Sequence, residues 1–328
     1  MKASILVITY NSASLISHFG NIIKDSIQCI EEVVVIDNAS SDKTVDNIES
    51  LNGVNFPLKL VRNSKNEGYR KALNQGMALC KSKYVVSINL DIYFKKGSLC
   101  DLIELAPLNG NIRCVLPIVF QRDRKQPYVV SRETVPFLSI YNQVPKKINY
   151  SGQDNIATEI CGGPCFLIDR DAFLTSGILS EEIPMYNEET EMSVKMRNAG
   201  YKFVVTEKLE IFHNWGSSTS DFSERNLRRD FFIRNWLVST IRLYEMFSYH
   251  DGKLKKIIWK VLFLIKAFWY SLYQADSSYL FLAFGLVKSF NSVPTDFRLE
   301  SRWRILLFFG TEFADLIRVV SKSKITGG

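Results

Sequence analysis

The chain has 328 residues, of which 46% are hydrophobic and 23% are charged. This composition is too apolar for an intrinsically disordered protein, and the length indicates about two domains, or one large domain with an appendage. The 41 Lys and Arg outnumber the 34 Asp and Glu, giving a formal net charge of +7. The positive balance favours an anionic partner, which can be nucleic acid, a phosphorylated ligand or an anionic membrane surface.

The first two thirds of the chain alternate short β-branched runs with stretches of helical spacing. The expected strands are Ala3–Ile8, Glu32–Ile36, Leu58–Val61 and Tyr84–Ile88, and the expected helices are 12–24, 42–51 and 68–81. The alternation predicts an α/β fold with a mostly parallel sheet flanked by helices on both faces. Ligands of such sheets bind outside the carboxyl ends of the strands, so the residues that follow each strand are the first candidates for a site.

The later segments are less regular. Residues 121–157 read as an irregular insertion, strand character resumes in 158–168, and the helical pattern of Glu188–Ala199 ends at Gly200. The composition changes at about residue 220, beyond which we expect helices at 222–247, 253–273, Tyr279–Val287 and Ile305–Val320. We therefore predict two domains, 1–220 and 221–328, the second a C-terminal α-helical region.

The helix expected at 253–273 sets lysines beside a dense apolar and aromatic run. Lys260 and Lys266 interrupt that run, so it falls short of the ~18–20 uncharged residues of a spanning helix. Two interpretations remain open: the helix lies at the interface of an anionic bilayer, or it packs on the first domain or on a second copy of the chain in a homo-oligomer.

The six cysteines include no Cys-x-x-Cys pair, which argues against a disulfide scaffold and a zinc ribbon and favours a reducing compartment. The opening run Ala3–Ile8 lacks the length and the cleavage site of a secretory signal. We expect a cytoplasmic protein, with the inner face of the membrane as an alternative location.

Polar residues follow the first two strands. Thr9, Tyr10 and Asn11 follow the first, and Asp37 and Asn38 follow the second. The carboxylate of Asp37 can accept hydrogen bonds from a nucleobase edge or a ribose diol, or it can belong to a turn that caps the next helix.

Asn66 and Gly68 precede a helix start that carries Arg70 and Lys71. Backbone N–H groups and two cations at this place suit a diphosphate. An ordinary turn with a solvated basic face explains the same residues equally well.

Asn89 and Asp91 follow the fourth strand and point to the same side of it. One carboxylate and one amide oxygen can bind Mg²⁺ or Mn²⁺ together with diphosphate oxygens, or they can cap a strand end. His213 is one of three histidines, and the Gly and Ser residues that follow it suggest a phosphate loop, although a packed structural histidine is the commoner case.

The acidic run Glu188-Glu189-Thr190-Glu191 lies at an expected helix N-terminus, where the helix dipole stabilises negative charge. A carboxylate held rigidly there can act as a general base, particularly with apolar neighbours that raise its pKa. An exposed capping cluster is the alternative.

Taken in chain order, these motifs together with Cys161-Gly162-Gly163-Pro164-Cys165 resemble the family 2 glycosyltransferases. The resemblance covers about residues 3–245 and is greatest to the bacterial rhamnosyltransferase-type members that build O-antigen, capsule or related cell-surface polysaccharide. It implies a Rossmann-like GT-A domain and a metal-dependent, inverting sugar transfer.

The resemblance also implies roles for the candidate residues. Donor binding falls to Thr9, Tyr10, Asn11, Asp37, Asn38, Asn66, Gly68, Arg70, Lys71 and Asn89; the metal to Asp91 and His213; the acceptor to Gly162, Gly163 and Glu191. Glu189 is the implied base and Glu188 its rival. The family's usual Glu-Asp-x-Asp is replaced here by Glu-Glu-Thr-Glu, whose longer side chains require the backbone to sit further back.

The function expected from these observations is transfer of a sugar, with rhamnose one candidate, from a dTDP- or UDP-sugar to a saccharide or polyprenyl-diphosphate-linked acceptor. Two alternatives remain: a nucleotidyltransferase of sugar phosphates, and a non-catalytic scaffold that binds nucleotide-sugars. We expect no nucleic-acid partner, because the positive charge is not concentrated on a recognition helix or an aromatic-studded sheet.

Overall fold

The computed structural model describes residues 1–53, 56–106, 110–121, 127–128, 147–150, 153–158, 161–183 and 188–214. The helices expected beyond residue 220, the basic helix at 253–273 and the loop after His213 lie outside these residues. The domain boundary near residue 220 therefore stays a prediction.

The described strands form one mixed sheet in the order β3-β2-β1-β4-β10-β6-β11-β9-β8, with β5 paired to β11 and β7 to β6. The strands are β1 Ala3–Thr9, β2 Ile30–Asp37, β3 Leu58–Arg62, β4 Tyr84–Ile88, β5 Ile92–Phe94, β6 Ile112–Gln121, β7 Pro127–Tyr128, β8 Lys147–Tyr150, β9 Gln153–Thr158, β10 Cys165–Asp169 and β11 Lys202–His213. The first four are mutually parallel, and β10 runs antiparallel to both of its neighbours, β4 and β6.

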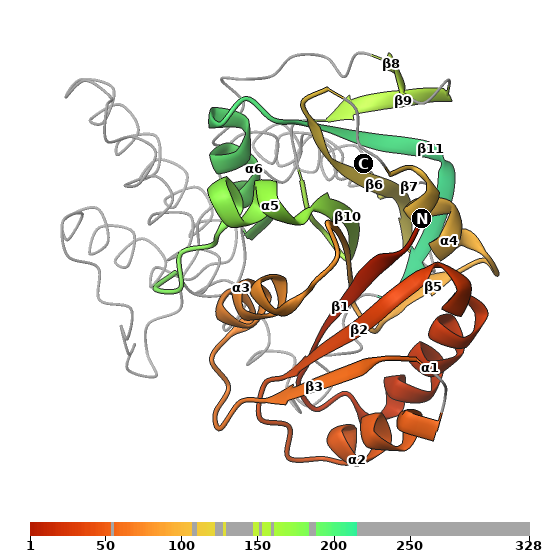
Figure 1. Cartoon of the computed structure of the whole chain (residues 1–328), viewed down its shortest axis with the longest axis vertical. Coiled ribbons are helices and arrows are strands. Elements are labelled where there is room, and N and C mark those ends of the chain that lie inside the picture. Colours follow the sequence, from red (N-terminus) through yellow and green to blue (C-terminus); the bar gives the residue numbers. More distant parts are fainter. Residues whose placement is uncertain are drawn as a thin grey trace, which may run out of the picture. The chain divides into compact units, whose positions relative to one another are not determined.

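Helices cover both faces of the sheet (Figure 1). They are α1 Ile16–Asp25, α2 Thr44–Glu49, α3 Tyr69–Leu79, α4 Ser98–Glu104, α5 Arg170–Ala172 and α6 Glu188–Asn198, with a π turn at Phe173–Gly177 and 3-10 turns at Ala13–Leu15, Ile27–Cys29 and Ser50–Gly53. Alternate residues of β1 belong to two separate cores, since Ile5 and Val7 pack with α1, α2 and α4, whereas Leu6 packs with α3 and α6. The expected α/β fold is confirmed.

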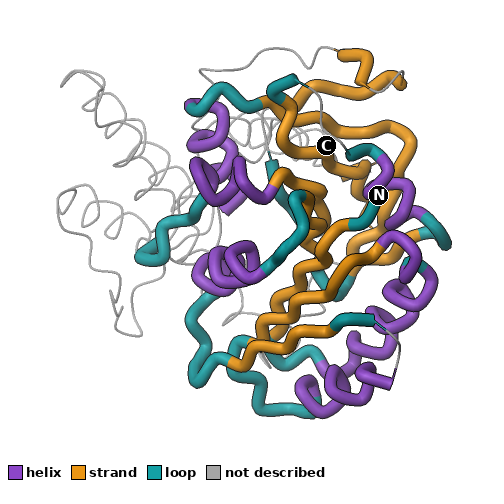
Figure 2. The backbone as a smooth tube through the Cα atoms, in the orientation of Figure 1, coloured by secondary structure: helices purple, strands orange, loops and turns teal. Residues whose placement is uncertain are grey.

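Helix α3 lies unusually close to the sheet. A Cβ atom at Gly76 would be 2.2 Å from Cδ1 of Leu6 and 3.2 Å from Cγ1 of Ile36, so a larger residue would have to displace the Leu6 side chain. The chain enters α3 from the end of β3, so the N-terminus of α3 lies at the carboxyl edge of the sheet, where β1, β2 and β4 also end (Figure 2). The strand order reverses at β1, and such a switch point is where ligands bind in open α/β sheets.

The second half of the sheet departs from the sequence prediction. Residues 121–157 were expected to be irregular, but they contain β7, β8 and most of β9. Strand β9 pairs antiparallel with β8, which lies just before it in the sequence, and with β11, which lies far away in the sequence. Strand formation here depends on those partners rather than on local propensity, which is low for Gln153-Asp154-Asn155.

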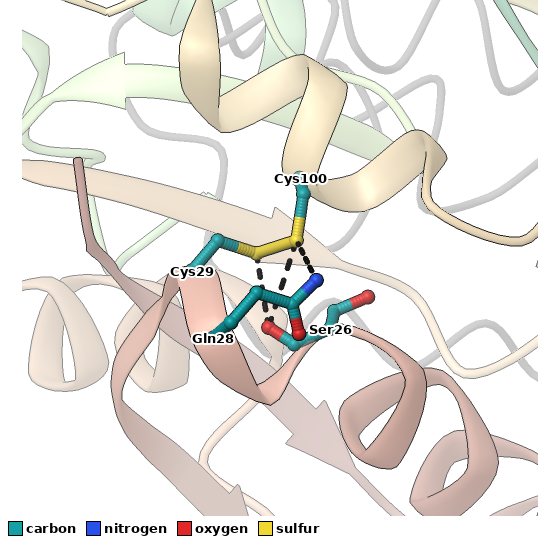
Figure 3. Close-up of a disulfide and its surroundings, with 4 residues drawn as sticks. All are labelled: Ser26, Gln28, Cys29 and Cys100. Carbon is teal, nitrogen blue, oxygen red and sulfur yellow. Dashed lines mark hydrogen bonds between the residues drawn. A yellow bond between two sulfur atoms is a disulfide. The ribbon is translucent and has the colours of Figure 1, made fainter.

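Cys29 and Cys100 form a disulfide, with Cα atoms 5.6 Å apart, that links the 3-10 turn after α1 to the first turn of α4 (Figure 3). The cysteine pattern, which argued against a disulfide scaffold, did not predict this single cross-link. Cys80, Cys114, Cys161 and Cys165 are free and buried. Among the described helices, none has the length and apolar character needed to cross a bilayer.

Candidate active site

Asp37 ends β2 at the carboxyl edge of the sheet and is only 1% exposed. Its Oδ1 accepts a hydrogen bond from the Thr9 hydroxyl at 3.0 Å, and its Oδ2 accepts one from the Ser40 N–H at 3.0 Å. The Ser40 hydroxyl also donates to Oδ1. The structure thus brings together Thr9 and Asp37, as the sequence predicted, and fixes the carboxylate from two sides.

Asn38 connects this strand end to the loop before α3. Its Nδ2 donates to Asn66 Oδ1 and to the Gly68 carbonyl, both at 3.1 Å, and its Oδ1 accepts from Asn63 Nδ2 at 3.0 Å. Asn38 is 3% exposed. This amide therefore holds the loop that contains Asn66 and Gly68 against the end of β2.

Tyr10 and Asn11 form the turn after β1. Asn11 has a φ of 48°, and its Oδ1 accepts a hydrogen bond from the Ser41 N–H at 2.8 Å. The Tyr10 side chain is 46% exposed, which leaves its ring accessible at the switch point. Lys71, by contrast, is half exposed and donates to Glu67 Oε2 at 3.1 Å, an i,i+4 pair that links the first turn of α3 to the loop before it.

Asp91, which directly precedes β5, lies next to His213, the last residue of β11. The antiparallel pairing of β5 with β11 sets His213 opposite Ile92, and His213 Nε2 lies 3.1 Å from Asp91 Oδ1. The Asp91 side chain is 4% exposed and that of His213 is 16% exposed. Two groups on neighbouring positions of an octahedral ion, each about 2.1 Å from it, lie about 3 Å apart, so the pair fits a divalent cation.

The donor set is compatible with Mn²⁺, which takes both imidazole and carboxylate ligands, and less with Mg²⁺, which prefers oxygen. Within the part of the chain that the structure describes, no group of three or more His, Cys, Asp or Glu could hold a metal.

The Gly162–Gly163 turn lies against the end of β4 and against α6. The Asn89 N–H donates to the Pro164 carbonyl at 2.8 Å, which ties the turn to the strand end. Gly162 has a φ of 115°, and a Cβ atom there would lie 2.9 Å from Cγ of Glu189. The structure therefore brings Asn89, Gly162 and Glu189 to one place, three residues that the sequence assigned to one site.

Glu189 lies in the first turn of α6 and is partly buried. Burial raises the pKa of its carboxyl group, and the positive charge of Arg70 opposes that shift without cancelling it. Its backbone carbonyl accepts a hydrogen bond from Ser193, whose hydroxyl also accepts from the Cys161 N–H at 2.7 Å. Ser193 thus connects α6 at Glu189 to the residue that precedes the Gly162–Gly163 turn.

Glu191 and Arg70 are placed differently from their predicted roles. Arg70 is 2% exposed, and its Nη1 donates to Glu191 Oε2. The other oxygen of Glu191 accepts from the Ser180 N–H at 2.8 Å, the Ser180 hydroxyl at 2.6 Å and Lys195 Nζ at 2.6 Å. Burial alone would raise the pKa of Glu191, but Lys195, Ser180 and Arg70 outweigh it and lower the pKa. Glu191 is thus held as an anion inside the protein.

Three supporting residues were missed by the sequence analysis. Ser180 and Lys195 bind Glu191, and Tyr69 lies near Glu188 and Glu189 with its hydroxyl hydrogen-bonded to Ser87. Burial and the two nearby carboxylates raise the pKa of Tyr69, so it is neutral. No sequence motif marks these residues, because each acts through a contact with a distant element.

The strand order and the flanking helices define a GT-A-type α/β fold, which two solved structures share. A mannosyltransferase from Pyrobaculum calidifontis in complex with GDP-Man and Mn²⁺ superposes with a TM-score of 0.53 at 18% identity, covering 77% of this chain and 65% of that one. GalNAc-T7 with UDP, GalNAc and Mn²⁺ gives 0.52 at 15% identity over 66% and 44% of the two chains. At these identities the likeness shows the fold alone.

The family model described as glycosyl transferase family 2 matches residues 4–176, more than half of the chain, and the chain belongs to that family. A dolichol-phosphate mannosyltransferase of Pyrococcus furiosus is 28% identical over 34% of this chain. The poly(ribitol-phosphate) β-N-acetylglucosaminyltransferase TarS of Staphylococcus aureus is 27% identical over 43% of it. The chain covers only 31% and 25% of those two relatives, so their activities are not carried over. The family prediction is confirmed; none of these relatives is a rhamnosyltransferase.

Proposed function

We propose that the chain is an inverting glycosyltransferase that moves a sugar from a nucleoside-diphosphate sugar to a hydroxyl group of an acceptor. The single observation that carries this proposal is the placement of Glu189, a partly buried carboxyl group with a raised pKa, against Gly162 at the carboxyl edge of the sheet. A base of this kind is needed to deprotonate an alcohol near neutral pH. Family membership supports the same reaction class and disfavours the nucleotidyltransferase alternative.

In the proposed reaction the acceptor oxygen attacks the anomeric carbon of the donor sugar. Its proton goes to Glu189 as the new C–O bond forms, and the bond between the anomeric carbon and the diphosphate oxygen breaks. The diphosphate leaves with that electron pair. One displacement of this kind inverts the configuration at the anomeric carbon.

The donor is proposed to lie along the carboxyl edge of the sheet. Thr9 and Asp37 would face the nucleoside, with Tyr10, Asn11, Asn38, Asn66 and Gly68 forming the wall around it, and Asn89 beside the diphosphate. Asp91 and His213 would hold Mn²⁺ or Mg²⁺, which when bound neutralises charge on the departing diphosphate. Gly163 would border the acceptor.

The donor class stays open between several nucleotides. The two structural neighbours were solved with GDP-Man and with UDP, whereas the sequence resemblance suggested a dTDP- or UDP-sugar, with rhamnose one candidate. A role in O-antigen, capsule or other cell-surface polysaccharide synthesis, a lipid-linked acceptor and a cytoplasmic location at the membrane surface are proposals from that resemblance alone.

Calorimetric titration with UDP, dTDP, GDP and CMP, each with Mn²⁺ and again with EDTA, tests the donor site. We expect one nucleotide to bind, more tightly with Mn²⁺, and Asp91→Asn to lose that metal effect. Asp46→Asn, an exposed residue of α2, is the matched control and should keep it. Absence of binding by every nucleotide would contradict the proposal, and binding without cleavage of any nucleotide-sugar would favour a scaffold.

A further inference from the structure

The first turn of α6 carries three glutamates within four residues, and they differ in burial and in the groups that they contact. Glu191 is 0% exposed and has four donors around its carboxylate. Glu188 is 8% exposed, and its Oε1 lies 3.9 Å from Arg70 Nε. Glu189 faces Gly162 instead. One arginine from another helix, Arg70, therefore forms ion pairs with Glu191 and Glu188, and its charge also acts on Glu189.

Arg70 reaches this position because of how α3 begins. Gly68, with a φ of 84°, ends the loop that Asn38 organises, and α3 starts at the next residue. Arg70 is thus the second residue of the helix and is directed into the protein, where only 2% of it is exposed. Its guanidinium group links α3, which follows the loop on the donor side of the proposed site, to α6, which carries the proposed base.

We propose that Arg70 is a positioning residue that, by binding Glu191 and Glu188, fixes the first turn of α6 and makes Glu189 the base. This inference rests on the proposed function, since it concerns the same reaction. In the sequence analysis, Arg70 was assigned to direct contact with the diphosphate. The positioning role and the diphosphate-binding role predict different experimental results.

The charged groups around Glu189 make the proposal testable through pH. Tyr69 and Arg70 face it from α3, Cys161 from the glycine turn, and Glu188 precedes it on its own helix. Burial raises the pKa values of Tyr69 and Cys161, so both stay neutral in the working range. The charges that remain are Arg70, Glu188 and, beyond Arg70, Glu191 with its partner Lys195.

Removing one partner of the ion pair should therefore change the pKa of Glu189 in a direction set by the charge removed. Arg70→Gln takes away a positive charge, so the acidic limb of the kcat profile should move to higher pH. Glu191→Gln takes away a negative charge and releases Arg70 toward its neighbours, so the limb should move to lower pH. Arg70→Lys keeps the charge and should restore the limb toward its wild-type position.

The experiment compares the pH profile of nucleotide-sugar cleavage and the affinity for the nucleoside diphosphate in these three variants. We expect Arg70→Gln to lower kcat about tenfold or more, because a displaced base aligns poorly, and to change the diphosphate Kd by less than about twofold. Arg170→Gln is the matched control, since Arg170 binds the Met77 and Ala78 carbonyls near the start of β4, at the opposite edge of the sheet, and should leave both readouts unchanged.

The proposal is supported if the acidic limb shifts in opposite directions in Arg70→Gln and Glu191→Gln. A general loss of packing would not shift the limb of each variant in a direction set by the charge removed. A tenfold weaker diphosphate Kd in Arg70→Gln with an unmoved limb would overturn it and make Arg70 a donor ligand. Shifts in the same direction would also overturn it. A wild-type chain that cleaves no nucleotide-sugar would instead reject the proposed function. Arg70→Lys keeps the test informative if Arg70→Gln does not fold.

Discussion

The two sides of the first turn of α6 place chemically identical side chains in opposite environments. On one side, Glu191 is buried among Arg70, Ser180 and Lys195, and its pKa is lowered. On the other side, Glu189 packs against Gly162 and its pKa is raised. The comparison teaches that hydrogen-bond donors, not burial, decide which carboxylate is a structural anion and which can exchange a proton.

The strongest test of this comparison neutralises, one at a time, the two neighbouring candidates for the base. Glu189→Gln should lower kcat for nucleotide-sugar cleavage by a factor of about 10²–10⁴, because the isosteric amide cannot accept a proton. The nucleoside diphosphate should still bind. Glu188→Gln is the matched variant and should cost far less, since Glu188 lies toward Arg70. A larger loss in Glu188→Gln than in Glu189→Gln would reverse the assignment.

The second test concerns the structural side. Glu191→Ala leaves the buried charge of Arg70 without its main counter-ion, and we expect the free energy of unfolding to fall by about 3–5 kcal/mol. Chemical denaturation measures this loss. Glu210→Ala is the control, because the Lys95–Glu210 pair is exposed, at 68% and 39%, and such pairs contribute about 0–1 kcal/mol. Equal losses in the two variants would show that the Glu191 network is not a stabilising element.

A smaller effect is expected from the glycine turn that touches Glu189. Gly162→Ala places a methyl group 2.9 Å from Cγ of Glu189 and should lower kcat about tenfold or more by displacing that side chain. Gly200→Ala is the matched control, because Gly200 also has a positive φ, of 86°, but nothing lies within 4 Å of the added atom. Both variants should lose about 1–2 kcal/mol of stability from backbone strain. If both reduce kcat alike, the contact with Glu189 has no part in catalysis.

The parallel half of the fold could be predicted from the sequence. Strands β1 to β4 are short apolar runs with polar residues at their ends, and α6 has both an acidic first turn and Gly200 beyond its end. The mixed half could not. Strand β9 contains Gln153, Asp154 and Asn155, and it is a strand because β11 and β8 supply its hydrogen-bond partners.

The sequence singled out residues that the structure brings together in pairs, but it did not show the environment of each. Thr9 with Asp37 and Asp91 with His213 meet as expected, since each pair lies at the ends of neighbouring strands or segments. Arg70 and Glu191 were expected to face ligands. A sequence shows that they are charged, but not that α3 and α6 approach closely enough to bury them against each other.

The most direct test of the central claim is the pH dependence of kcat for cleavage of the nucleotide-sugar selected by titration, measured in the wild type and in Glu189→Gln. The base must be ionised to accept a proton, and burial raises its pKa, so the wild-type rate should fall as the pH drops through that raised value and reach a plateau above it. Glu189→Gln should be slow at every pH and lack this limb. A variant that keeps both the wild-type rate and the wild-type limb would contradict the claim that Glu189 is the base.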